Sequence, residues 1–239
     1  MRFILFCMYF FVANSISAQI NINKLKDVAS KAEKVINRRN LSSDEVAKGL
    51  KEALIVGITN STVNASKTGG FNLDLLIKIR FPKDAKKMKV ALVKFGMKSQ
   101  VDKFEYALNE AAENASNYAK DIFINSVKSM TIKDAVSVLK GDDNAATIYL
   151  KNRTSDDLYL KFKPIISKSI EKVRLTKYWA DLVEKYNSIP LTEEVNTDLD
   201  DYVTNQTING LFILIGKEEK NIRNNPQARV TDILQKVFK

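Results

Sequence analysis

Apolar residues recur every three or four positions over most of the chain, which is the pattern of helices that pack through one face. The longest such run covers residues 99–130, and the alanines in its middle predict close approach by another helix. Ser42 with Glu45 and Thr131 with Asp134 have the spacing of capping boxes, so each pair predicts the start of a helix. Further helices are expected over residues 82–94, 143–153, 156–171, 175–187, 198–223 and 226–238.

The pattern changes in the segment FNLDLLIKIRFP, where alternate residues are apolar. This period of two is typical of a strand. Because no other part of the chain has it, a sizeable sheet is not expected, and we predict one short extended segment near 72–81 that lies across helices or forms a small ribbon. The fold class predicted is therefore all-α: a single-domain bundle of about eight to ten helices.

The N-terminus has the layout of a secretory signal peptide: Arg2, an apolar run over residues 3–12, and then small polar residues that favour cleavage after Ala18. The alternative is a membrane anchor, but the run has roughly ten residues where a membrane span needs about 20. We therefore expect a signal peptide at 1–18, a charged arm at 19–40 and a helical domain at 41–239, exported to the periplasm and without a transmembrane segment once the signal is removed.

Two missing residue types narrow the possible chemistry. The chain contains no histidine, and its one cysteine, Cys7, lies within the expected signal peptide. Catalytic triads, cysteine–histidine pairs and zinc sites made of imidazole or thiolate are thereby excluded from the mature chain. No glycine-rich phosphate-binding loop occurs either. The sequence indicates no cofactor, and no metal ligand can be named from it. What remains is binding or carboxylate chemistry, either an acid–base pair acting on a glycan or an all-oxygen Mg²⁺ or Ca²⁺ site.

The formal net charge is +10, with 38 basic and 28 acidic residues. Most of the basic residues are lysines spread singly along predicted helices. Nucleic-acid readers instead cluster arginines with aromatic residues, so we predict no nucleic-acid partner. A weak attraction to anionic surfaces of the cell envelope follows from the charge alone.

The stretch GDDNAATIYLKNRT contains the first group of candidate site residues. Asp142 and Asp143 follow a glycine and precede a predicted helix, where aspartate can accept free amides of the first turn. Thr154 is expected to start the next helix in the same way. Tyr149 and Arg153 are four residues apart, hence on one helix face, and the arginine is suited to pairing with a carboxylate.

The C-terminal region offers partners for that arginine. Glu219 and Arg223 are also four residues apart, and Arg229 and Asp232 follow. We predict that these residues form a buried ionic cluster joining several helices; the alternative is pairing at the surface. Asn109 and Glu113, on one face of the alanine-rich helix, are weaker candidates for which a solvated face is the alternative.

Several separated motifs resemble one bacterial family, the domain-of-unknown-function 4197 family. They are TGGF, IKIRFP, LNEAAENA, MTIKDAVSVLKG, DDNAATIYLKNRT, DLDDYVTNQTINGLF and EEKNIRNNPQARVTDILQKVF. The resemblance extends from about residue 41 to the C-terminus. It implies a mostly helical, exported envelope protein of a Gram-negative bacterium, and it brings no activity or ligand with it.

The leading functional hypothesis is a non-enzymatic envelope protein that binds a small or lipid-like ligand or another envelope protein. The alternative is a carboxylate-dependent hydrolase or lyase acting on peptidoglycan, using Glu113 or Glu219. The two differ in one structural expectation, because an enzyme of that kind needs a deep cleft that holds a carboxylate of raised pKa.

Overall fold

The computed structural model describes residues 42–190, 192, 195, 197–229 and 232–237. The chain divides into two compact units, Met1–Leu41 and Ser42–Lys239. The predicted signal peptide and charged arm fall in the first unit and lie outside the described residues. Within the described part, no helix is both long and apolar enough to cross a membrane.

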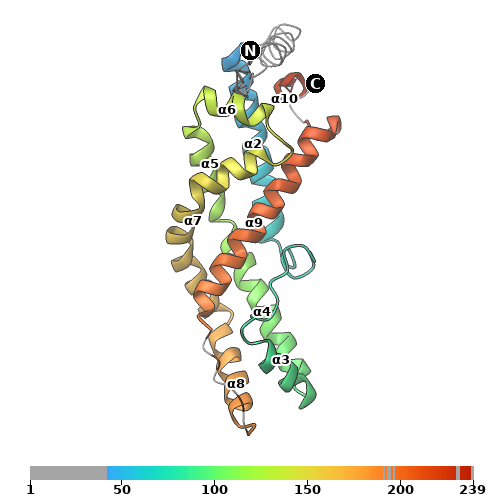
Figure 1. Cartoon of the computed structure of the whole chain (residues 1–239), viewed down its shortest axis with the longest axis vertical. Coiled ribbons are helices and arrows are strands. Elements are labelled where there is room, and N and C mark those ends of the chain that lie inside the picture. Colours follow the sequence, from blue (N-terminus) through green and yellow to red (C-terminus); the bar gives the residue numbers. More distant parts are fainter. Residues whose placement is uncertain (1–41, 191, 193–194, 196, 230–231, 238–239) are drawn as a thin grey trace, which may run out of the picture. The chain divides into compact units, whose positions relative to one another are not determined.

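The second unit is all-α, as predicted, and no strand is assigned among its described residues. Figure 1 shows the arrangement of its helices. In chain order these are α2 (Ser43–Ser66), α3 (Lys86–Lys94), α4 (Lys98–Ser116), α5 (Ala119–Ser129), α6 (Ile132–Lys140), α7 (Ala145–Lys172), α8 (Leu175–Asn187), α9 (Leu199–Asn224), the 3₁₀ helix η1 (Pro226–Ala228) and α10 (Asp232–Val237).

Four long helices form the centre of the bundle. α9 crosses α7 and α2, and α4 lies against α2, α7, α8 and α9 (Figure 1). The alanines predicted to allow close approach are fully buried on α4, among them Ala107, Ala111 and Ala115. Aromatic rings fill the remaining space, and the largest of the fully buried ones are Phe71, Phe104, Phe123 and Phe162.

The capping boxes are confirmed. The Ser42 hydroxyl accepts the Glu45 amide while the Glu45 carboxylate accepts the Ser42 amide, and Thr131 and Asp134 repeat the arrangement. Asn225 accepts the amide of Gln227, but it starts the short η1 and not one long C-terminal helix.

Several predicted helix boundaries are wrong. The helix predicted over residues 82–94 begins only at Lys86. The helices predicted over residues 143–153 and 156–171 are one helix, α7. Thr154 does not cap a new helix, because it is buried and its hydroxyl donates to the Leu150 carbonyl one turn back. Conversely, the predicted helix 99–130 is two helices. The Tyr118 amide bonds the Ala115 carbonyl only three residues back, in the turn that separates α4 from α5.

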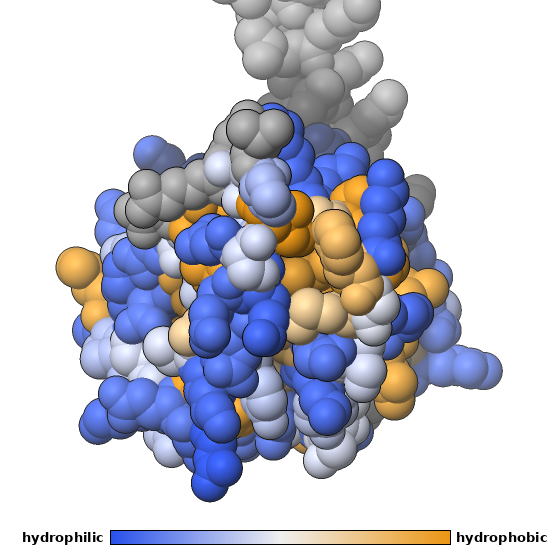
Figure 2. All heavy atoms as spheres, turned by 90° about the horizontal axis from the view of Figure 1, so that it is seen from below, coloured by the Kyte–Doolittle hydropathy of each residue, from blue (hydrophilic) through white to orange (hydrophobic). Residues whose placement is uncertain are grey.

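One end of the bundle, where α3 and α8 lie, has apolar residues on its surface among hydrophilic ones (Figure 2). A shallow groove there has a volume of about 290 Å³. Leu92, Phe95, Met97 and Ile189 line it together with Lys185. Its lining residues differ from those of the groove described in the next subsection.

Candidate functional site

The segment that follows α2 is held against α4 by three polar side chains at intervals of four residues. Glu113 accepts the backbone amides of Gly69, Phe71 and Asn72 at 3.0, 3.0 and 3.1 Å. These bonds account for the burial of this carboxylate, which is 6% exposed. Glu113 therefore holds the TGGF turn, and its role is neither a solvated face nor a free acid.

One and two turns before Glu113 on α4, two more side chains bind the backbone of residues 79–81. The Asn109 amide accepts the Ile79 N–H at 2.8 Å and donates to the Ile79 carbonyl at 2.8 Å, the two bonds that a neighbouring strand would make. Glu105 accepts the amide of Phe81 at 3.0 Å. This ladder explains why residues 77–81 have a strand-like pattern without a sheet.

The predicted extended segment is not extended throughout. Asp74 interrupts it, because its carboxylate accepts the Leu76 amide and its carbonyl accepts the amides of Ile77 and Lys78, which makes a turn. Phe71 is buried against Gly210 so closely that a Cβ at position 210 would lie 2.7 Å from the ring. Residues on the two sides of this turn are thus anchored in the core.

A groove lies between residues 78–84 and the first half of α9, with a volume of about 720 Å³. Lys78, Arg80 and Lys83 lie along one wall. The other wall carries Tyr202, Gln206 and Asn209. The Tyr202 hydroxyl donates to the Arg80 carbonyl at 2.9 Å and so ties the walls together. Burial, with Asp84 and Glu105 nearby, raises the pKa of Tyr202 above its usual range.

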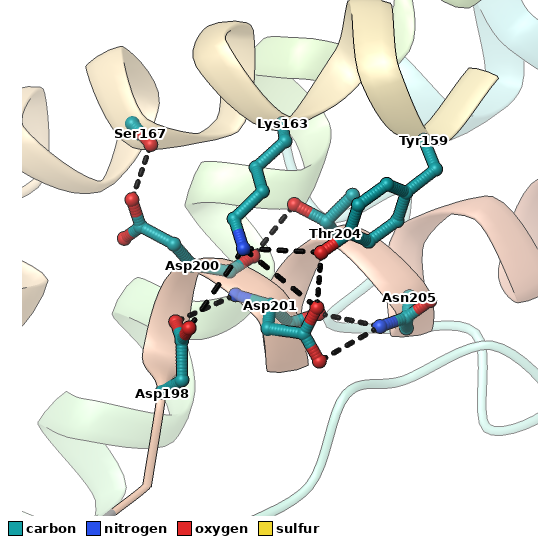
Figure 3. Close-up of polar contacts among 8 residues, drawn as sticks. All are labelled: Tyr159, Lys163, Ser167, Asp198, Asp200, Asp201, Thr204 and Asn205. Atoms are coloured by element: carbon teal, nitrogen blue, oxygen red, sulfur yellow. Dashed lines mark hydrogen bonds and ion pairs between the residues drawn. The ribbon is translucent and has the colours of Figure 1, made fainter. Parts of the chain in front are cut away.

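Two of the three acids that line this groove, Asp198 and Asp201, are already bonded within the protein (Figure 3). Lys163 of α7 lies 3.7 Å from the Asp198 carboxylate and 3.8 Å from that of Asp201. Asp201 also accepts the Tyr159 hydroxyl and the Asn205 amide. The hydrogen bond from Lys163 to Tyr159 raises the pKa of Lys163, which keeps this lysine charged.

The third acid, Asp84, accepts the Thr197 hydroxyl at 2.8 Å. By contrast, the side chains of Lys78, Arg80 and Lys83 make no hydrogen bond or ion pair with another described residue. Three cations of the groove therefore have no described partner, whereas each of its three acids has one, including Asp84 on the same wall as the cations. Such an arrangement favours an anion.

The residues predicted near the C-terminus form a separate polar cluster. Glu219 accepts the amides of Ala146 and Thr147 at 2.9 and 2.8 Å, which caps the start of α7. Arg223 pairs with Glu219 at 2.9 Å and donates to the Val138 carbonyl at the end of α6. The pair is buried and joins α6, α7 and α9.

Beside this pair lies a cavity of only about 20 Å³, which has room for one water molecule. The pair therefore has a structural role and offers no space for a ligand. Arg229 extends the cluster by donating to the carbonyls of Ile222 and Arg223 at the end of α9. Asp232 is the first residue of α10, and its side chain lies outside the described residues.

Tyr149 and Arg153 are not brought to this cluster. The Arg153 guanidinium lies over the Tyr149 ring at 5.7 Å and forms no ion pair with a described carboxylate. The Tyr149 hydroxyl donates to Asp134 at 3.3 Å. Asp142 and Asp143 are exposed, and neither side chain caps α7 as expected.

The groove residues were not predicted from the sequence, in which residues 198–223 were predicted as a helix and DLDD was noted only as part of a family motif. The sequence does contain one sign of a cationic site, because Lys78, Arg80 and Lys83 lie within six positions, directly after the apolar residues 75–77. In the described part, no three or more His, Cys, Asp or Glu side chains are grouped so that they could hold a metal ion.

Comparison with known proteins agrees with the motif resemblance. The model of a protein family described as "Protein of unknown function (DUF4197)" matches residues 40–239. No curated protein and no solved structure matches the chain.

Proposed function

The chain belongs to the DUF4197 family, whose function is unknown, and we propose from its site that it is an exported, non-enzymatic protein of the cell envelope that binds a small or lipid-like anion. The observation that carries this proposal is the charge of the groove. Its three cations, Lys78, Arg80 and Lys83, have no partner among the described residues, whereas each of its acids has one.

The size and lining of the groove agree with a small organic ligand. Pockets for such ligands have volumes of roughly 300–1,000 Å³ and combine apolar surface with a few polar groups, and this groove has about 720 Å³. Phe81 gives it an apolar part, while Tyr202 and Gln206 supply hydrogen-bonding groups. A carboxylate or phosphate on the ligand would lie at Arg80, whose guanidinium can donate two parallel hydrogen bonds.

The alternative of a peptidoglycan hydrolase or lyase finds no support in the two glutamates named for it. Both oxygens of Glu113 accept backbone amides, and both oxygens of Glu219 accept amides or the Arg223 guanidinium. A general acid must carry a proton, and protonating either carboxylate would break bonds that stabilise the fold.

Export is proposed from the N-terminal sequence. The test is to express the full chain in a Gram-negative host, fractionate the cells and sequence the N-terminus of the recovered protein. We expect periplasmic protein that starts at Gln19. Unprocessed chain in the cytoplasmic fraction would contradict this part of the proposal.

Ligand binding is tested by incubating the purified protein with envelope extract and identifying retained molecules by mass spectrometry. We expect an anionic molecule that is lost in the double variant Arg80→Gln, Lys83→Gln and kept in the charge-matched control Lys151→Gln, Arg153→Gln. Lys151 and Arg153 are exposed on α7. Recovery of nothing, together with peptidoglycan digestion that disappears in Glu113→Gln or Glu219→Gln, would reverse the assignment.

A further inference from the structure

We propose that residues 67–83, here called the leucine loop, dock onto the surface of an anionic lipid bilayer. The loop includes Lys78, Arg80 and Lys83, which also line the groove, so the proposal shares these cations with the proposed anion site and adds three exposed leucines to them. It rests on the exposure of three leucines, on the rigidity with which the loop presents them and on the charge around them.

Leu73, Leu75 and Leu76 are 78%, 74% and 65% exposed. Single exposed apolar residues are ordinary on protein surfaces, but three within four positions concentrate exposed apolar area on one short loop. No other stretch of four residues in the described part exposes three large aliphatic or aromatic side chains.

The leucines cannot turn inward, because the inward positions of the loop are filled. Phe71, Ile77 and Ile79 are 0%, 5% and 1% exposed and belong to the core. The backbone on both sides of the leucines is bonded to α4, through Glu113 before them and Asn109 after them. The loop thus presents its leucines in a fixed arrangement, and little conformational entropy is lost when they enter an apolar phase.

The charge of the loop fits an anionic surface. Residues 67–83 contain four basic side chains and one acid, Asp74. The Asp74 carboxylate is engaged by the Leu76 amide at 3.0 Å. Lys78, Arg80 and Lys83 have no described partner and follow the leucines directly. Apolar residues that enter a bilayer, flanked by cations that meet anionic headgroups, are the combination that interfacial binding requires.

The same charge argues against a second copy of this chain as the occupant. If two leucine loops met face to face, four basic residues and one acid of each copy would come together. The repulsion between these like charges opposes association of two copies, whereas an anionic bilayer attracts the same basic residues. Self-association is therefore an outcome that the experiment must detect.

The absence of cysteine outside residue 7 allows a local test. The full chain with Cys7→Ser receives a single cysteine at Leu75 and is labelled with an environment-sensitive nitrobenzoxadiazole dye. The control carries the cysteine at Leu160, which is 71% exposed on α7 and far from the loop in sequence. The label reports its own surroundings, so binding through another part of the chain does not imitate the result.

The probe is vesicles of phosphatidylcholine alone or mixed equally with phosphatidylglycerol. We expect the dye at position 75 to shift to the blue and brighten at least twofold with the anionic vesicles only, and the dye at position 160 to be unchanged. The additional changes Leu73→Asn and Leu76→Asn, or Lys78→Gln, Arg80→Gln and Lys83→Gln, should each remove most of the response. Salt at 0.5 M should weaken it, because the charges are exposed.

Several results would overturn the proposal: no response at position 75, an equal response at position 160, or an equal response to neutral vesicles. A blue shift that grows with protein concentration in the absence of vesicles would assign the loop to self-association. The Leu73→Asn, Leu76→Asn variant separates this proposal from the groove ligand, because it changes the loop and leaves every cation of the groove in place. Thermal unfolding by circular dichroism should be unchanged in that variant, since both side chains are exposed.

Discussion

The bond between Glu113 and the TGGF turn can be tested by replacing Glu113 with Gln. One oxygen of the carboxylate accepts the amides of Phe71 and Asn72, and the other accepts the amide of Gly69. In the variant the side-chain amide oxygen can take the place of only one carboxylate oxygen. The NH₂ group then takes the place of the other oxygen and faces a backbone N–H. The variant loses at least one hydrogen bond to a charged acceptor, and two buried donors face each other.

Hydrogen bonds to charged groups are worth about 1.5–3 kcal/mol, and a buried donor without an acceptor costs about 1–3 kcal/mol. We therefore expect Glu113→Gln to lower the free energy of unfolding by about 3 kcal/mol. Urea denaturation followed by circular dichroism measures this value, with the slope m as a check on two-state unfolding. Glu110→Gln is the control on the same helix, because the side chain of Glu110 forms no hydrogen bond or ion pair with a described residue. Its free energy of unfolding should change by no more than about 0.5 kcal/mol.

Hydrogen exchange locates the effect. The amides of Phe71 and Asn72 should exchange faster in Glu113→Gln than in the wild type, while the amides at the centre of α7 should lose protection only as far as global stability falls. A variant as stable as the Glu110→Gln control, with unchanged exchange at Phe71, would refute the role assigned to Glu113 in holding the loop.

Three further predictions concern stability. Gly210→Ala should lower the free energy of unfolding by about 1–2 kcal/mol, because the new Cβ would lie 2.7 Å from the Phe71 ring. In Gly216→Ala, also on α9, the nearest atom would be 3.5 Å from the new Cβ, so this variant should be neutral or more stable by up to about 1 kcal/mol. Thermal unfolding of the two variants tests the difference. Glu219→Gln should cost about 3 kcal/mol in urea denaturation, since it replaces the charged acceptor of the Glu219–Arg223 pair and of two amides at the start of α7. Tyr202→Phe should cost about 1 kcal/mol at pH 7 by loss of its bond to the Arg80 carbonyl. The pKa of Tyr202 is raised above 10.0 in the folded chain, so its contribution to stability is complete below pH 10 and is lost as the pH rises through the folded pKa. The difference in stability between wild type and Tyr202→Phe should therefore shrink in alkaline solution. A difference that stays constant with pH would contradict this reasoning.

Most of the helices could be predicted because their signals are local. A capping box such as Ser42 with Glu45 is contained within four residues, and the spacing of apolar residues within a helix is visible along the sequence. The errors occur where a side chain has two possible roles. Thr154 was expected to cap a helix, but in the folded chain it is buried in mid-helix and bonds Leu150, a choice that its tertiary neighbours decide.

The site could not be predicted in the same way. The strand-like pattern of residues 77–81 was visible, but its hydrogen-bonding partners are the side chains of Asn109 and Glu105, which lie 30 and 24 residues after Ile79 and Phe81. Likewise, the sequence does not tell a paired charge from a free one. Asp201 and Arg80 differ in this respect only because α7 brings Lys163 to the former and nothing described to the latter.

The central claim is that the cations of the groove hold an anionic molecule, and native mass spectrometry of the protein purified after envelope exposure tests it most directly. We expect a one-to-one adduct on the wild type and on Lys151→Gln, Arg153→Gln, and no adduct on Arg80→Gln, Lys83→Gln. An adduct of equal abundance on all three proteins, or on none, would contradict it.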